Sequence, residues 1–188
     1  AFPSEAITIE SWIRPEPGQS KFAIIGWAED QPFESTGSGW FLGATEGKWS
    51  FSLATSESTS LIRAQSNSPV RGGLWVHVVG VYDPEEAALT VYVDGERVAI
   101  HNNVQGKIRY PEGGFFEIGA FHDSDEFRRF AGGMTEIIVY GRALSGDEIN
   151  TRFQQTRSQH PQIEIQPEFF DVVWGPFLEW VGPDQVEV

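Results

Sequence analysis

The most regular pattern of hydrophobic and polar positions lies in the middle of the chain. Three runs there are rich in the β-branched and aromatic residues that favour strands: residues 75–82, 88–93 and 96–100. Asp94-Gly95 joins the last two runs, and this pair is typical of a two-residue hairpin turn because both of its residues must adopt positive φ. The pattern predicts a three-stranded antiparallel meander that buries one face against a second sheet.

Similar strand patterns recur on both sides of this meander, with turn residues between them. They cover residues 6–14, 21–28, 40–44, 48–54, 61–64, 115–120 and 134–140. The first of them carries apolar residues on both faces, so we expect either a bulge near Ser11 or a strand that is covered on both sides. The spacing is that of an antiparallel sandwich or barrel, and a chain of 188 residues can form one as a single domain.

One helix start follows the last strand pattern. Ser145 can accept from the amide of Glu148 while the Glu148 side chain accepts from the amide of Ser145, which is a capping box. We expect the helix to run to about Gln155. Ile149 and Phe153 are four residues apart, so both should face the sandwich.

The character of the chain changes after Ser158, which divides the prediction into two parts. Residues 1–158 form the sandwich, and residues 159–188 form an apolar extension interrupted by prolines. Its aromatic side chains predict an interface, because apolar patches of this size mark contact surfaces: Phe170, Trp174, Phe177 and Trp180. Either the extension folds back as a strand that seals the sandwich, or it docks on a partner or on a second copy.

Charge and composition narrow the classes of partner. Thirteen basic and 27 acidic residues give a net charge of −14, which argues against nucleic acid and anionic membranes because both bind basic patches. There are no cysteines, which excludes disulfides and cysteine-based zinc sites. No window has the ~18 apolar residues of a membrane span. A signal peptide is absent or already removed. Neutral glycans, cations and basic proteins all fit this charge.

A long polar loop at residues 29–39 is the first candidate for ligand binding, since loops of this length are often functional. Trp27, Phe33 and Trp40 flank or occupy it. We expect one or more of these rings to form an exposed platform, because aromatic rings present flat apolar faces. Tryptophans within regular strand patterns, at positions 12, 49 and 75, are expected in the core.

A second candidate is the acidic loop that begins at residue 122. Asp123, Asp125 and Glu126 offer alternating oxygen ligands, which is how a calcium site begins, because calcium takes six to eight oxygens. The alternative is a solvated acidic turn. Arg128 and Arg129 follow directly, and they are expected to pair either with these acids or with a ligand.

Catalytic patterns are weak. Glu164 and Glu168 resemble the paired carboxylates of laminarinase-like glycosidases, but Gln166 replaces the middle acid and Pro167 would remove a hydrogen-bond donor from the strand. The four histidines, at positions 77, 101, 122 and 160, have no metal-ligand spacing. His77 lies between apolar strand neighbours and is predicted to be a satisfied structural histidine. No enzymatic activity is predicted.

Three segments carry a resemblance to a known family: residues 7–15, residues 74–96 and residues 131–149. Their order and spacing resemble those of a LamG-like jelly roll, the laminin G and pentraxin-like group of the concanavalin A-like lectin/glucanase superfamily. The resemblance covers roughly residues 5 to 155. It implies a jelly-roll fold and a recognition role, although this fold carries many functions.

The chain departs from the family pattern in two places. Members usually have a further strand before the segment that begins here at Ile7. Either this strand is supplied from elsewhere, or its neighbour is an exposed edge. Many members also carry an aspartate where this chain has Thr135, so the family's calcium site is not carried over.

The sequence therefore predicts an all-β, two-sheet antiparallel jelly-roll sandwich with one short C-terminal helix. The predicted function is a non-catalytic recognition module that is secreted, periplasmic or at the cell surface. The family resemblance implies that its ligand is a carbohydrate, which we expect to be bound by the loop aromatics with Asp123, Arg128 and Arg129, and calcium is the one candidate cofactor. The alternative is a domain for protein interaction or assembly that uses the apolar tail. A glycosidase or lyase comes third.

Overall fold

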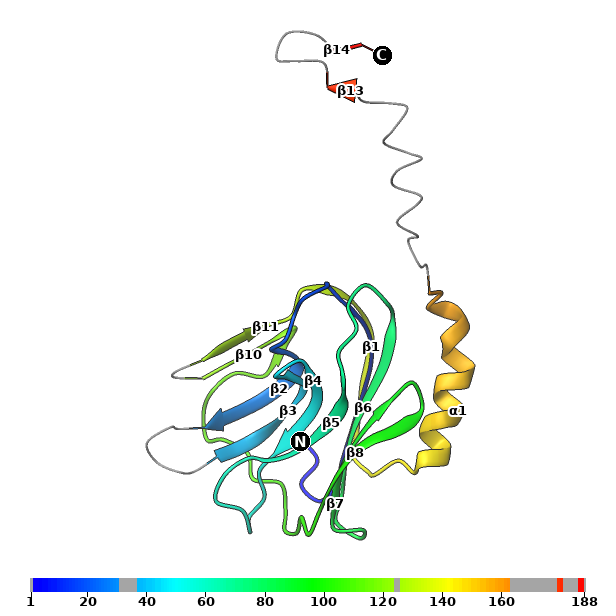
Figure 1. Cartoon of the computed structure of the whole chain (residues 1–188). Helices are drawn as coiled ribbons and strands as arrows, with labels where there is room; N and C mark the ends of the chain where they lie inside the picture. Colours follow the sequence, from blue (N-terminus) through cyan, green and yellow to red (C-terminus); the bar gives the residue numbers. More distant parts are fainter. Residues whose placement is uncertain (1, 31–36, 124–125, 163–178, 181–185, 188) are drawn as a thin grey trace.

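The computed structural model describes residues 2–30, 37–123, 126–162, 179–180 and 186–187 (Figure 1). One five-stranded antiparallel sheet has the order β12 (Gly132–Tyr140), β1 (Ile7–Pro15), β6 (Val76–Asp83), β7 (Ala88–Val93) and β8 (Glu96–Asn102). The other has the order β5 (Ile62–Pro69), β4 (Lys48–Leu53), β3 (Gly37–Thr45), β2 (Phe22–Asp30) and β9 (Glu117–Ile118).

The remaining elements are short. Strands β10 (Ala120–His122) and β11 (Phe127–Arg129) form a hairpin, and β13 (Glu179–Trp180) pairs with β14 (Val186–Glu187). Helix α1 (Gly146–Thr156) is followed by one 3-10 turn, Arg157–Gln159. The prediction of a two-sheet antiparallel sandwich with one short C-terminal helix is confirmed. None of the described helices is long and apolar enough to cross a membrane.

The central meander forms as its pattern predicts. Strands β6, β7 and β8 pair antiparallel in sequence order. The turn between β7 and β8 has φ of 51° at Asp94 and 82° at Gly95, the two positive values that this turn needs. Leu89 and Val91 on β7 are completely buried, so the meander contributes one apolar face to the core.

The core lies between the two sheets. Side chains of Ile7, Ile9 and Ile13 on β1 meet Phe51 and Leu53 on β4 in one buried cluster. Packing there is close enough to require a glycine on β6, because a Cβ added at Gly80 would lie 2.7 Å from the Phe51 ring.

Strand β1 is covered on both faces, and a bulge lies where the sequence places it. The β1–β12 register shifts between Glu10 and Trp12, opposite Glu136, which has φ of 52°. The apolar residues on both faces of β1 therefore have both of the expected explanations, a bulge near Ser11 and cover on each face. Since β1 pairs with both β6 and β12, β1 is not an edge strand, and the edges of this sheet among the described residues are β12 and β8.

The segment 115–120 differs from the prediction of one strand. Gly119, with φ of 77°, separates β9 from β10. Strand β10 pairs with β11, which lies within the acidic loop that the sequence predicts from residue 122. Residues 115 and 116 precede β9 and lie at the surface. Strand β5 is longer than the predicted 61–64, because its pairing with β4 continues across a register shift to Pro69.

Helix α1 packs on the outer face of the sheet that contains β6 (Figure 1). The predicted capping box between Ser145 and Glu148 is present. Ile149 is completely buried, and the ring of Phe153 stacks 5.8 Å from Trp12. Both predicted contact residues therefore face the sandwich.

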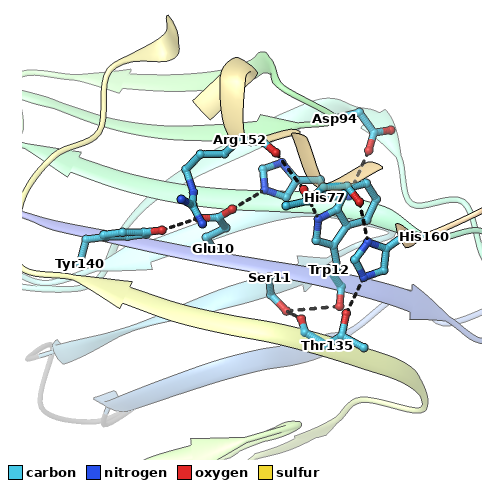
Figure 2. A network of polar contacts seen from close by, with 10 residues as sticks. Glu10, Ser11, Trp12, His77, Asp94, Thr135, Tyr140, Arg152 and His160 are labelled. Atoms are coloured by element: carbon cyan, nitrogen blue, oxygen red, sulfur yellow. Dashed lines mark hydrogen bonds and ion pairs between the residues drawn. The ribbon is translucent and has the colours of Figure 1, made fainter. Parts of the chain in front are cut away.

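A buried polar network fastens the helix to the sheet (Figure 2). The carboxylate of Glu10 on β1 lies 3.0 Å from His77 Nε2, 2.5 Å from Arg152 Nε and 2.9 Å from the Tyr140 hydroxyl. The side chains of Glu10 and His77 are 2% and 0% exposed. One carboxylate thus joins β1, β6, β12 and α1.

The network keeps Glu10 ionised despite its burial. Burial raises the pKa of Glu10, but hydrogen bonds from His77, Arg152 and Tyr140 outweigh it and hold the pKa below 4.5. Burial together with the Glu10 charge raises the pKa of Tyr140 to about 12. The prediction that His77 is a satisfied histidine holds for Nε2, which lies at Glu10, but not for Nδ1, which has no hydrogen-bond partner among the described residues.

Replacing Glu10 should cost stability in a pH-dependent way. We expect Glu10→Gln to lower the free energy of unfolding at pH 7 by about 2 kcal/mol, because charge-assisted hydrogen bonds are lost. The folded-state pKa lies below 4.5, so this contribution is present above pH 4.5 and is lost as the pH falls through the folded-state value. Urea unfolding between pH 7 and pH 3 should show the difference shrinking. A difference that stays constant would contradict the assignment, and Glu86→Gln on the surface is the control.

Filling the space at Gly80 should also destabilise the sandwich. Gly80→Ala would place a methyl group against Phe51, and we expect it to cost about 1–3 kcal/mol through overpacking. Gly113→Ala is the matched control, since nothing lies within 4 Å of its added Cβ. Thermal unfolding should show a lower Tm for the first variant only, and equal Tm values would show that the core relaxes around the methyl group.

Candidate functional site

The three ring candidates of the sequence lie in different environments. Trp40 is completely buried, and its indole lies 3.3 Å from the Tyr110 hydroxyl. The ring belongs to the inner face of β3, so it is not an exposed platform. Trp27, its cross-strand partner on β2, is half-buried. Phe33 lies outside the described residues.

A group of rings gathers near the end of β2, and we call it the aromatic corner: Trp27, Phe115, Phe116, His122 and Phe127. Phe115 and Phe127 are 61% and 59% exposed. The Phe115 ring stacks on His122 with ring centres 4.6 Å apart, and the Phe127 ring lies edge-on to His122 at 5.8 Å. These three rings form the outer part of the corner.

The inner part of the corner is held by the N-terminal segment. The Phe2 ring lies 5.2 Å from Trp27 and 5.3 Å from Phe116. The indole of Trp27 donates to the carbonyl of Gly113 at 2.9 Å. Contacts on two sides therefore fix the short segment that carries Phe115 and Phe116.

Carboxyl groups border these rings. Glu117 Oε2 accepts from the backbone amide of His122 at 2.9 Å and lies 2.8 Å from its Nδ1, which fixes the orientation of the imidazole. Glu29 lies against Gly114, where an added Cβ would be 2.2 Å from Glu29 Oε1. Burial and the nearby charge of Asp123 raise the pKa of Glu29, while His122 opposes them. The corner therefore combines exposed rings with hydrogen-bond acceptors.

The acidic loop is organised by ion pairs. Asp123 Oδ1 accepts from the amide of Glu126 at 2.9 Å, and the Glu126 carboxylate pairs with Lys21 and with Arg128. Arg128 is 6% exposed and lies 4.9 Å from the centre of the Phe41 ring. The ion pair between Arg128 and Glu126 is one of the two predicted alternatives. Because the Arg128 side chain is buried, it anchors β11. Ligand contact by Arg128 is not supported by this position.

Arg129, in contrast, is exposed and lies over Phe127 at 5.8 Å from the ring centre. The structure therefore brings Trp27, Asp123 and Arg129 to the same region as the outer rings.

Two sets of predicted site residues remain untested. In the part of the chain that the structure describes, no three His, Asp or Glu side chains are placed to hold a metal ion. Asp125 lies outside that part, so calcium at this loop stays a prediction. Phe170, Trp174, Phe177, Glu164 and Glu168 also lie outside it. Of Trp180 only the backbone is described, paired with Val186. Docking by the tail stays a prediction as well.

Sequence reasoning missed the exposed rings of residues 115, 116 and 127. The sequence places residues 115 and 116 in a strand and residue 127 in the acidic loop that begins at residue 122, and neither pattern marks these rings as exposed. The available signal was the Gly113-Gly114 pair in front of them, because glycine pairs mark a loop.

Comparisons with known proteins give a consistent classification. A family model of the concanavalin A-like lectin/glucanases superfamily, Laminin_G_3, matches residues 1–150. Mouse pappalysin-1 is 26% identical over 199 residues, which cover 98% of this chain but 12% of the mouse protein. This chain thus spans about an eighth of that relative's length.

Solved structures agree in fold. The CBM40 domain of a Ruminococcus gnavus sialidase, bound to α2,3-sialyllactose, superposes with a TM-score of 0.63 at 18% identity, covering 80% of this chain and 84% of that one. A heptameric SAP-like pentraxin from Limulus polyphemus gives a TM-score of 0.54 at 18% identity, covering 80% and 70%.

The strand order, the capped helix on the outer face of the sheet and the family match over residues 1–150 agree with one another. The chain belongs to the Laminin_G_3 family of the concanavalin A-like lectin/glucanases superfamily.

Proposed function

We propose that this chain is a non-catalytic, extracellular carbohydrate-binding module and that the aromatic corner binds the glycan. The observation that carries the proposal is the pair of exposed rings, Phe115 and Phe127, which both contact His122, one stacked on it and one edge-on. Large apolar side chains exposed together on a surface usually mark a binding site.

The chemistry of the corner suits a sugar. Aromatic rings offer flat apolar faces to the C–H face of a pyranose, and edge groups that accept hydrogen bonds can meet its hydroxyls. Carboxyls of Glu29 and Glu117 and the guanidinium of Arg129 border the rings. Small-molecule sites show this same combination of apolar surface and a few fixed polar groups.

The rings are also held in place before a ligand arrives. Phe116 packs on Phe2, and Glu117 fixes His122, so little side-chain freedom is lost when a ligand binds. The binding of α2,3-sialyllactose by the R. gnavus CBM40 domain, which has the same fold, supports the ligand class. It does not identify the sugar.

Protein docking at the same corner is the second candidate. Phe2, Phe115, Phe116, Ile118 and Phe127 are all more than 40% exposed, and a surface with several exposed apolar side chains also suits a protein partner. A search for glycan ligands separates the two candidates, because a protein-docking surface need not retain any sugar.

Removing the outer rings should weaken glycan binding without unfolding the protein. After a glycan array identifies a ligand, we expect Phe115→Ala and Phe127→Ala each to lower its affinity by about three- to tenfold, since a ring contact contributes about 0.5–1.5 kcal/mol. Isothermal titration calorimetry gives the affinities. The control is Ile100→Ala, which removes a side chain that is 45% exposed on β8.

Two results would reject the proposal. One is an array on which the intact chain retains no glycan. The other is a ligand whose affinity falls equally with Ile100→Ala and with the ring variants, because binding would then lie elsewhere.

A further inference from the structure

A cleft opens between the two sheets beside helix α1. The cleft has a volume of about 490 Å³, within the range of small-molecule sites, which is about 300–1,000 Å³. Its apolar lining comes from both sheets and the helix: Trp49 of β4, Val76 of β6, Val93 of β7, Val98 of β8 and Phe153 of α1. None of the aromatic-corner residues lines it.

Three charged side chains also line this cleft: Arg71, Asp94 and Glu96. Arg71 comes from the loop between β5 and β6, and the two acids flank Gly95 in the turn between β7 and β8. Within the described part of the chain, none of the three forms an ion pair with another residue. The cleft therefore presents one cation and two anions around an apolar surface.

The carboxylate of Asp94 is held in position by the backbone. Its Oδ1 accepts from the backbone amide of His77 at 3.0 Å. Asp94 is exposed as a residue, but partial desolvation of its carboxyl raises its pKa and the charge of Glu96 adds to this, while the backbone hydrogen bond and the electrostatic interaction with His77 oppose both. A ligand cation placed beside Asp94 and Glu96 would favour the ionised form.

We propose that this cleft binds a small zwitterion with an apolar body, namely an apolar α-amino acid or dipeptide. The ligand carboxylate would pair with Arg71, whose guanidinium matches the planar carboxylate group. The ligand ammonium would lie at Asp94 and Glu96, and its side chains would cover the valine and aromatic surface. A ligand of this kind can form ion pairs with all three charged groups, whereas a neutral sugar can meet them only through hydrogen bonds and a simple cation leaves Arg71 unpaired.

The test uses the full chain with leucyl-leucine as the probe and two blocked forms as controls. Acetyl-leucyl-leucine lacks the ammonium, and leucyl-leucinamide lacks the carboxylate. In ¹H–¹⁵N correlation spectra we expect leucyl-leucine to shift the amides of residues 93–98, Arg71 and Phe153. Its affinity should exceed that of each blocked form by about fivefold, as expected for one exposed ion pair.

Two variants assign the ends of the ligand. Arg71→Gln should reduce the affinity for leucyl-leucine to that for leucyl-leucinamide. It should leave the affinity for leucyl-leucinamide unchanged. Glu96→Gln should reduce the affinity for leucyl-leucine toward the affinity for acetyl-leucyl-leucine. Arg97→Gln is the matched control, because Arg97 is exposed beside Glu96 but does not line the cleft, and it should change none of these affinities.

Either of two results would overturn the proposal. One is that no amide of the cleft residues shifts. The other is that the free and blocked dipeptides bind with equal affinity, because the ligand would then be held by apolar contacts alone. Phe115→Ala should leave dipeptide binding intact whether or not the corner binds a glycan. A failure of one proposal is therefore distinguishable from a failure of the other.

Discussion

A single negative charge beneath helix α1 holds together parts of the chain that are far apart in sequence. Glu10 sits on β1, yet it contacts His77, Tyr140 and Arg152 from three other elements. Removing a carboxylate from water is unfavourable unless each lone pair finds a donor. The arrangement is satisfied only when β6, β12 and α1 are all in their native positions, so the charge makes the docking of the helix specific as well as stable.

Much of the fold could be predicted because its signals are local. The Asp94-Gly95 turn and the Ser145–Glu148 capping box each depend on a few neighbouring residues, and both are present. The Glu10 network could not be predicted in the same way, since its members are separated by up to 142 residues. Contacts of this kind are set by the packing of the sheets and not by any nearby sequence pattern.

The candidate site was less predictable than the fold. Trp40 and Trp27 are cross-strand partners, and only their different depths in the sandwich separate a core residue from a half-buried one. Arg128 follows an acidic loop, which suggests a surface cation, but rings from Phe41 and Phe121 cover it. Phe115 differs in the opposite direction: it belongs to the predicted strand 115–120, but β9 begins only at Glu117, and the ring is 61% exposed.

The bulge on β12 has a consequence for how molecules of this chain meet in concentrated solution. Among the described residues, β12 is a nine-residue strand at one edge of its sheet, and an edge strand offers backbone groups along which an identical sheet could extend into a fibre. Glu136 interrupts that edge near its middle, since its positive φ breaks the regular spacing and its side chain is exposed and acidic. Two such edges brought together would face each other with mismatched backbones and like charges, on chains that each carry a net charge of −14.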